Sequence, residues 1–162
     1  MWASSTSCSP KRSAVWLSIG IGTPRVRGLN HLTIAVSDLD RSLAFYIDLL
    51  GLRLRARWEV GAYLDAGDLW LCLTVDPRTT AAVDYTHFAL DVASADFTAL
   101  AIKARQARVR EWQPNKSEGQ SLCILDPDGR RLELHVGTLQ SRLDQYRTTR
   151  PPIEIIDIDQ VS

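Results

Sequence analysis

The chain has 162 residues, 45% of them hydrophobic, which is enough for one domain with a sizeable core. Its 19 Lys and Arg residues balance its 19 Asp and Glu residues, so no basic field indicates a nucleic-acid partner. Cys72 and Cys123 lie in apolar runs without a CxxC pair, a pattern typical of reduced, buried thiols. We therefore expect a cytoplasmic protein that does not bind nucleic acid.

Residues 1–27 differ from the rest of the chain. They are rich in Ser, and Lys11 and Arg12 precede an apolar run at residues 14–22. This run resembles a weak signal peptide, but it is too short to span a bilayer and no A-x-A site follows it. We expect no membrane association. The segment is interpreted as a disordered or mis-started extension, with a targeting segment as the alternative.

A first βαβββ module is predicted over residues 28–76. Alternating apolar residues predict a strand over 29–36, and Ser37-Asp38 offers capping chemistry for a helix over 39–50 that Gly51 ends. Three short strands, separated by turn residues, are predicted over 53–58, 62–65 and 69–75.

The same order restarts after a polar connector and predicts a second module over residues 85–137. A strand is expected over 85–92, followed by a helix that Ser94 caps and that ends near residue 107. Three further strands are predicted over 109–112, 121–125 and 131–136. A C-terminal helix over 138–147 precedes a tail, residues 148–162, whose IEIIDI run fits either an edge strand or a disordered segment.

The two modules form an internal repeat of about 55 residues, which is a strong indicator of architecture. His31 aligns with His87, and LDAGDLWLCL aligns with LDPDGRRLELH, so that Cys72 stands where Glu133 stands in the second module. This repeat predicts an α+β fold in which paired βαβββ modules form curled mixed sheets around a cavity.

Glu133 lies in the last predicted strand and points away from the leucines on either side of it. A carboxylate on a face meant for burial needs a cation. His31 and His87 each lie near the start of a strand, and two histidines with one carboxylate suit Mn(II), Fe(II), Ni(II) or Zn(II) with open positions for a substrate. His135 shares the face of Glu133 and is a competing ligand, and each histidine taken alone fits a structural role.

These linked features resemble the vicinal oxygen chelate (glyoxalase/bleomycin resistance) superfamily, and more closely its fosfomycin-resistance glutathione transferases. The resemblance covers residues 28–147. The segments that carry it are NHLTIAVSDLDRSLAFY, ARWEVGAYLDAGDLWLCL, DYTHFAL, NKSEGQS and LDPDGRRLELHVG.

The resemblance implies a homodimer with shared active sites. His31 of one chain would bind Mn(II), or another divalent metal, together with His87 and Glu133 of the other. The metal would chelate fosfomycin while the thiolate of glutathione opens the epoxide, which suits a Lewis acid that neutralises a developing oxyanion. Thr33 matches a catalytic hydroxyl that hydrogen-bonds substrate oxygens, although β propensity alone would also explain a Thr there.

The resemblance also assigns further residues to binding roles. A potassium ion would be bound by the loop residues Asn115, Ser117, Gly119 and Ser121. The antibiotic would contact Arg142, Ser117, Ser121, Trp70 and Tyr85, and glutathione would contact Trp58 and Tyr63. For the four aromatic residues, ordinary core packing is the alternative.

Two positions depart from the family pattern. Gln113, followed by Pro114, replaces a lysine that binds the phosphonate, and Cys123 replaces a tyrosine. We therefore expect a thiol transferase whose fosfomycin turnover is reduced, or one adapted to another small anionic electrophile. The alternatives are a metal-dependent epoxide hydrolase, lyase or isomerase of the same superfamily, or a drug-sequestering binding protein.

Overall fold

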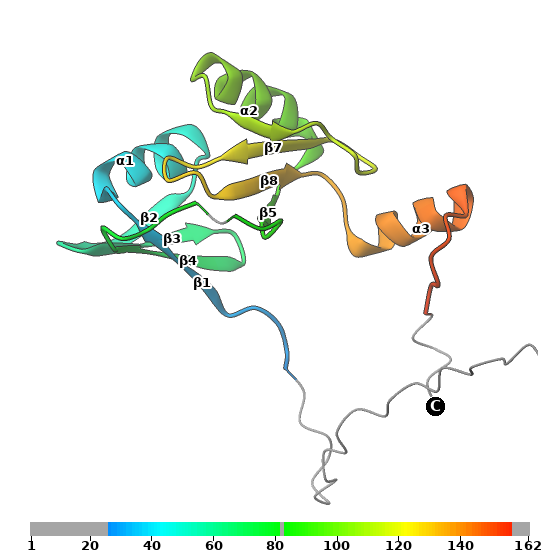
Figure 1. Ribbon diagram of the computed structural model, residues 1–162, viewed down its shortest axis with the longest axis horizontal. Helices are drawn as coiled ribbons and strands as arrows, with labels where there is room; N and C mark the ends of the chain where they lie inside the picture. Colours follow the sequence, from blue (N-terminus) through cyan, green and yellow to red (C-terminus); the bar gives the residue numbers. More distant parts are fainter. Residues whose placement is uncertain (1–25, 82, 157–162) are drawn as a thin grey trace, which may run out of the picture.

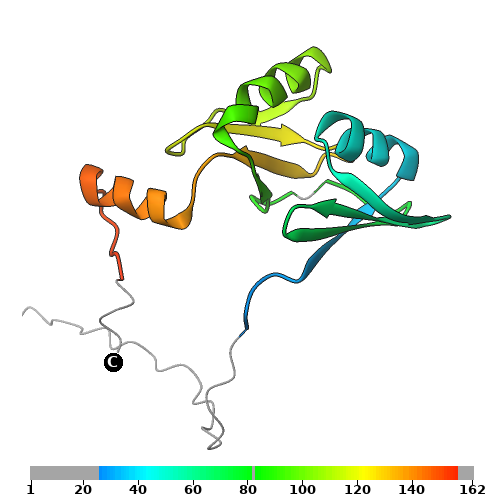
Figure 2. The same cartoon turned by 180° about the vertical axis from the view of Figure 1, so that it is seen from behind.

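The computed structural model describes residues 26–81 and 83–156, so the interpretation of residues 1–25 and the last part of the tail lies outside the described residues. Two four-stranded sheets form the body, and the helices of the two modules lie together on one side of them (Figures 1 and 2). None of the helices in the described ranges is long and apolar enough to cross a membrane.

The first sheet has the strand order β1-β4-β3-β2, in which β1 runs parallel to β4 and the other neighbours are antiparallel. The helical segment that links β1 to β2 begins as an α-helix, α1, and continues as a π-helix, η1, where one continuous α-helix was predicted. The elements are β1 (His31–Val36), α1 (Leu39–Leu43), η1 (Ala44–Leu49), β2 (Arg53–Trp58), β3 (Gly61–Ala66) and β4 (Leu69–Val75).

The second sheet repeats this topology with the order β5-β8-β7-β6, and β5 runs parallel to β8. Its elements are β5 (Phe88–Asp91), α2 (Ser94–Gln106), β6 (Glu111–Gln113), β7 (Ser121–Leu125) and β8 (Arg131–His135). The two sheets confirm the predicted α+β class of paired βαβββ modules.

The strand register confirms the alignment of the two modules. Thr33 on β1 lies opposite Cys72 on β4, and Ala89 on β5 lies opposite Glu133 on β8. Cys72 and Glu133 therefore occupy equivalent positions in the two sheets.

Several predicted element ends were wrong. β5 begins at Phe88 rather than at residue 85, which leaves His87 just before the strand. The cap predicted for Ser94 was also wrong: Ala93 has the extended backbone of an N-cap and makes no side-chain capping bond, so Ser94 is the first helical residue. Asp38 does cap α1, since its side chain accepts a hydrogen bond from the backbone N–H of Arg41 at 2.9 Å.

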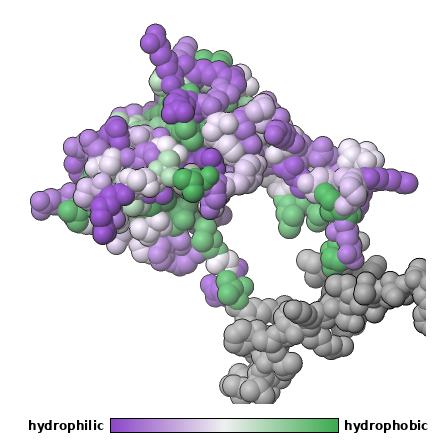
Figure 3. Space-filling view, in the orientation of Figure 1, coloured by the Kyte–Doolittle hydropathy of each residue, from purple (hydrophilic) through white to green (hydrophobic). Residues whose placement is uncertain are grey.

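The C-terminal helix α3 (Leu139–Thr149) extends two residues beyond its predicted end, and residues 151–156 after it form no strand. Thr138 and Ser141 form a capping box at its start. None of its residues is buried, and it projects from the end of the second sheet (Figure 1). The surface of α3 is mostly hydrophilic with small hydrophobic areas (Figure 3), and Leu139 is exposed.

The turn that precedes β8 joins the two modules within one chain. Ser37 donates hydrogen bonds to Asp128 from its backbone N–H and its hydroxyl, at 3.0 and 2.5 Å, and Arg41 forms an ion pair with the same carboxylate at 2.9 Å. Arg130 donates to the backbone carbonyl of Ala35. These contacts fix the start of β8 against the end of β1.

Asp126 is the buried centre of this turn. Its carboxylate accepts hydrogen bonds from the Tyr46 hydroxyl at 3.0 Å and from the backbone N–H groups of Asp128 and Arg130 at 2.9 and 2.8 Å. Burial raises the pKa of Asp126 above its ordinary value, although these hydrogen bonds oppose the shift. Burial and the neighbouring carboxylate also raise the pKa of Tyr46.

We predict that Asp126→Ala lowers the free energy of unfolding by about 1–3 kcal/mol, because it leaves the buried Tyr46 hydroxyl and two partly buried N–H groups without an acceptor. Asp126→Asn keeps an acceptor and should cost less. Urea unfolding of the natural protein and both variants measures the difference.

The raised pKa of Asp126 sets the expected pH dependence. The protonated carboxyl of Asp126 stabilises the folded protein at pH values below the pKa that this group has in the unfolded chain. That stabilisation is lost as the pH rises through the pKa that it has in the folded protein. The stability of Asp126→Asn relative to the natural protein should therefore increase as the pH rises over the interval above the ordinary aspartate pKa. A decrease over this interval would contradict the assignment.

Candidate metal and anion site

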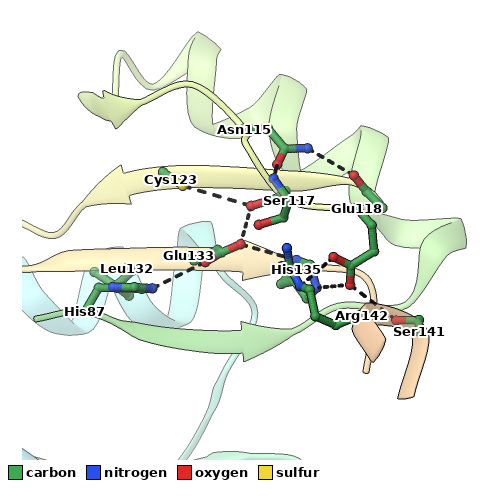
Figure 4. A network of polar contacts seen from close by, with 12 residues as sticks. His87, Asn115, Ser117, Glu118, Cys123, Leu132, Glu133, His135, Ser141 and Arg142 are labelled. Carbon is green, nitrogen blue, oxygen red and sulfur yellow. Dashed lines mark hydrogen bonds and ion pairs between the residues drawn. The ribbon is translucent and has the colours of Figure 1, made fainter. Parts of the chain in front are cut away.

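His87 and Glu133 are brought together by the parallel pairing of β5 with β8. The Nε2 atom of His87 lies 3.4 Å from the Oε2 atom of Glu133 (Figure 4). Glu133 is buried, and its other oxygen accepts a hydrogen bond from the hydroxyl of Ser121 at 2.5 Å. Two of the three predicted metal ligands therefore converge within one chain.

The ring orientation of His87 suits metal ligation. Its Nδ1 atom lies 3.1 Å from the backbone carbonyl of Tyr85, and a carbonyl only accepts hydrogen bonds, so Nδ1 carries the proton. In the neutral ring, the lone pair is then on Nε2, the atom that faces the Glu133 carboxylate. A second partner that fixes the tautomer in this way is typical of metal-binding histidines. The donor set therefore fits a divalent cation.

His31 lies on the other sheet, at the exposed start of β1. Its Nδ1 atom lies 2.8 Å from the side-chain oxygen of Asn30, and its ring lies 4.8 Å from that of Trp70. Thr33 is exposed two residues later on the same face of β1. Across residues 26–81 and 83–156, no group of three or more His, Cys, Asp or Glu residues is arranged to bind a metal ion. A single chain thus leaves His31 apart from His87 and Glu133.

His135, the competing ligand, flanks Glu133 from the opposite side. Its Nδ1 atom lies 3.2 Å from Oε1 of Glu133, outside hydrogen-bond geometry. Its Nε2 atom lies 3.9 Å from a second carboxylate, that of Glu118. His135 therefore separates two acidic side chains (Figure 4).

The loop of residues 115–121 is ordered by its own hydrogen bonds. Asn115 accepts from the backbone N–H of Ser117 at 2.7 Å and donates to the carbonyl of Gly119 at 3.0 Å. Gly119 has φ +72°, and a Cβ there would collide with the carbonyl oxygen of Val136. Amide, carbonyl and hydroxyl oxygens gather in one turn, which suits a hard cation in ligand type.

Arg142 reaches the site from the first turn of α3. Its Nε atom lies 2.5 Å from Oε2 of Glu118, and both side chains are partly buried. No local pattern in the sequence indicates this role for Glu118, because its carboxylate lies in a loop and the arginine lies in a helix 24 positions later.

Gln113 and Cys123, the two departures from the family pattern, contact each other. The side-chain amide of Gln113 donates to Sγ of Cys123 at 3.5 Å and to the hydroxyl of Tyr85 at 3.2 Å. The sulfur also lies 4.0 Å from the hydroxyl of Ser121. Uncharged side chains therefore form a hydrogen-bonded network at the two positions where the resemblance led us to expect a lysine and a tyrosine.

The predicted aromatic residues of the first sheet form a cluster. Tyr63 packs edge-on against Trp58 and Trp70, with ring centres 4.8 and 4.9 Å away. All three rings are more than one-third exposed. The core-packing alternative is therefore wrong for these three residues, since the rings form a surface on the module that carries His31.

Comparison with known proteins identifies relatives over most of the chain. Residues 28–134 match the Glyoxalase/Bleomycin resistance protein/Dioxygenase superfamily. The chain is 53% identical over 129 residues to the glutathione transferase FosA of Serratia marcescens, covering 75% of this chain and 89% of that protein. It is 36% identical over 138 residues to the metallothiol transferase FosB of Lysinibacillus sphaericus, covering 82% and 98%.

Solved structures show the same fold. The fosfomycin resistance protein FosX of Mesorhizobium loti aligns with a TM-score of 0.60 at 25% identity, covering 74% of this chain and 99% of that one. FosX of Listeria monocytogenes, in complex with Mn(II) and sulfate, aligns with a TM-score of 0.65 at 25% identity, covering 75% and 99%. The chain therefore belongs to the Glyoxalase/Bleomycin resistance protein/Dioxygenase superfamily and, within it, to the family of the FosA and FosB thiol transferases.

Proposed function

We propose that this protein is a metal-dependent glutathione transferase that opens the epoxide of fosfomycin and thereby confers resistance to it. The observation that carries the proposal is the convergence of His87 and Glu133, in which Nε2 of His87 faces a buried carboxylate while Nδ1 is held by a backbone carbonyl. The 53% identity to a FosA glutathione transferase supports the choice of thiol and reaction.

The catalytic domain is assigned to residues 28–147, with modules at 28–76 and 85–137 and the C-terminal helix after them. The protein would act as a cytoplasmic homodimer. In the dimer, His31 of one chain completes the ligand set of the partner's second module. The exposure of His31, and its separation from the other two ligands within one chain, support this sharing.

Mn(II), the metal of the Listeria FosX complex, is the proposed cation, and K⁺ is proposed for the loop ligands Asn115, Ser117, Gly119 and Ser121. The bound divalent cation would supply a Lewis acid that neutralises the oxygen released from the epoxide carbon. The K⁺ loop would add positive potential beside the substrate anion.

The side chains of the protein would hold and orient the two substrates. Thr33 would donate a hydrogen bond to a substrate oxygen, and Arg142 would bind the phosphonate with its planar guanidinium. Ser117, Ser121, Trp70 and Tyr85 would complete the antibiotic site. Trp58 and Tyr63, on the exposed aromatic surface, would pack against glutathione.

We predict that purified protein with Mn(II), K⁺, glutathione and fosfomycin forms a one-to-one covalent adduct of glutathione and the antibiotic. Mass spectrometry of the products measures it, with omission of Mn(II) as the control. A diol in place of the adduct would indicate a hydrolase. Fosfomycin bound but chemically intact would indicate a sequestering protein.

We predict that one divalent metal binds per subunit and that His31→Ala, His87→Ala and Glu133→Ala each lower the metal content sharply, since three ligands are needed to retain an ion with open positions. Elemental analysis after dialysis measures the metal. His135→Ala is the matched control and should retain it. The reverse pattern would make His135 the ligand on β8.

A separate experiment tests whether the metal ligands of one site come from two chains. A mixture of inactive His31→Ala and inactive Glu133→Ala proteins should recover part of the activity after subunit exchange, because one of the two sites in each heterodimer is then intact. Verified heterodimers without recovery would place each site within one chain.

We predict that Gln113→Lys combined with Cys123→Tyr raises kcat/KM for fosfomycin, because a charged hydrogen bond contributes about 1.5–3 kcal/mol, or roughly ten- to a hundred-fold in binding. Replacing Gln113 also frees Tyr85 from its present partner. Metal affinity should stay constant. An equal or lower kcat/KM would indicate that the natural site is built for a different substrate.

A further inference from the structure

Glu118 holds the one arginine that the proposed function assigns to the phosphonate. We propose that Glu118 is a positioning residue, which fixes the guanidinium of Arg142 so that its outer nitrogens face the substrate anion. This inference rests on the proposed function, because it takes Arg142 as the anion-binding group.

The contact geometry leaves the binding end of Arg142 free. Glu118 engages Nε, which lies 2.5 Å from its Oε2 atom. Within the described part of the chain, the two terminal Nη nitrogens of Arg142 make no hydrogen bond to another residue. A guanidinium that is held at Nε can still present a planar pair of N–H donors, which is the geometry that suits a phosphonate.

The weak packing of α3 makes this contact decisive for the position of Arg142. No residue of α3 is buried. Its first turn is tied to the body through Glu118, which pairs with Arg142 and accepts a hydrogen bond from the hydroxyl of Ser141 at 3.4 Å (Figure 4). A carboxylate beside the N-terminus of a helix is also favoured by the helix dipole.

Glu118 itself is well fixed. Its side chain is 13% exposed, and it projects from the loop that Asn115, Ser117 and Gly119 order through internal hydrogen bonds. On its other side, it faces the imidazole of His135. The carboxylate is therefore a fixed ion-pair partner for Arg142, held in place by a loop of the sheet that carries Glu133.

Stability alone does not account for this pair. Burying two charges costs desolvation energy that their attraction often only balances. Here, Oε2 of Glu118 is buried without an aligned hydrogen bond, so the pair lacks the geometry that best offsets the cost. Orientation of Arg142 toward an anion is a function that such a pair can serve.

The test uses four variants of the full-length, Mn(II)-loaded protein: Glu118→Gln, Arg142→Ala, the double variant, and Glu111→Gln as a matched control. Glu111 forms an exposed ion pair with Arg105 at 2.9 Å, outside the site. The measurements are KM and kcat with fosfomycin and glutathione, the affinity for inorganic phosphate by calorimetry, and hydrogen exchange of residues 139–149.

We expect Glu118→Gln to raise KM for fosfomycin and weaken phosphate binding by about tenfold, with kcat at saturation and KM for glutathione nearly unchanged. In the Arg142→Ala background, Glu118→Gln should add little further loss, because both residues act through one contact. Exchange in α3 should increase in Glu118→Gln and stay unchanged in Glu111→Gln.

Independent, additive losses from the two single substitutions would overturn the proposal. So would unchanged phosphate affinity or unchanged exchange of α3 in Glu118→Gln. These readouts separate the inference from the proposed function: if the natural protein forms no adduct, the function fails. The phosphate affinities of the two single variants and the double variant, together with the hydrogen-exchange data, still decide whether Glu118 positions Arg142.

Discussion

The parallel pairing of the first and last strands of each module is the constraint on which the site depends. Parallel neighbours need a long connection. In each module the helical segment carries the chain from the first strand to the far edge of the sheet, and the antiparallel strands that follow bring it back beside the first strand. In the second module, this pairing places His87, the residue just before β5, within reach of Glu133 on β8. The turn around Asp126 then fixes β8 against the end of β1.

The same topology in the first module yields different chemistry. Cys72 holds the register position that Glu133 holds in the second module, so the strand beside β1 offers no carboxylate at that position. Around His31 lie exposed aromatic rings, including Trp70, rather than acidic groups. One module thus supplies an imidazole on an aromatic surface, and the other supplies an imidazole with a carboxylate. Two such unlike surfaces can complement each other across a pair of chains, in keeping with the proposed dimer.

Local patterns predicted the features that arise locally. Strand alternation identified Glu133 as facing away from its neighbouring leucines, and the repeat identified His31 and His87 as equivalent residues. The cap at Ser94 was wrong although Ser is a better N-cap residue than Ala: the carbonyl of Ala93 accepts the first helical hydrogen bonds, so α2 begins one residue earlier than the local capping preference predicts. The pairing of Glu118 with Arg142 was missed because it depends on where the chain returns after β8.

The charges of the side chains in the site explain why bound cations would be needed for the proposed binding of an anionic substrate. Among the side chains labelled in Figure 4, the carboxylates of Glu118 and Glu133 accompany one guanidinium, that of Arg142. Two carboxylates and one guanidinium leave an excess of negative charge when His87 is in the neutral form that binds a metal and the charges of these three groups are counted. Gln113 adds no charge where the family has a lysine. A phosphonate would therefore be repelled by these side chains alone, and bound cations would have to supply the missing positive charge. Rigid placement of the single arginine then matters all the more, because it is the one fixed cation of that network.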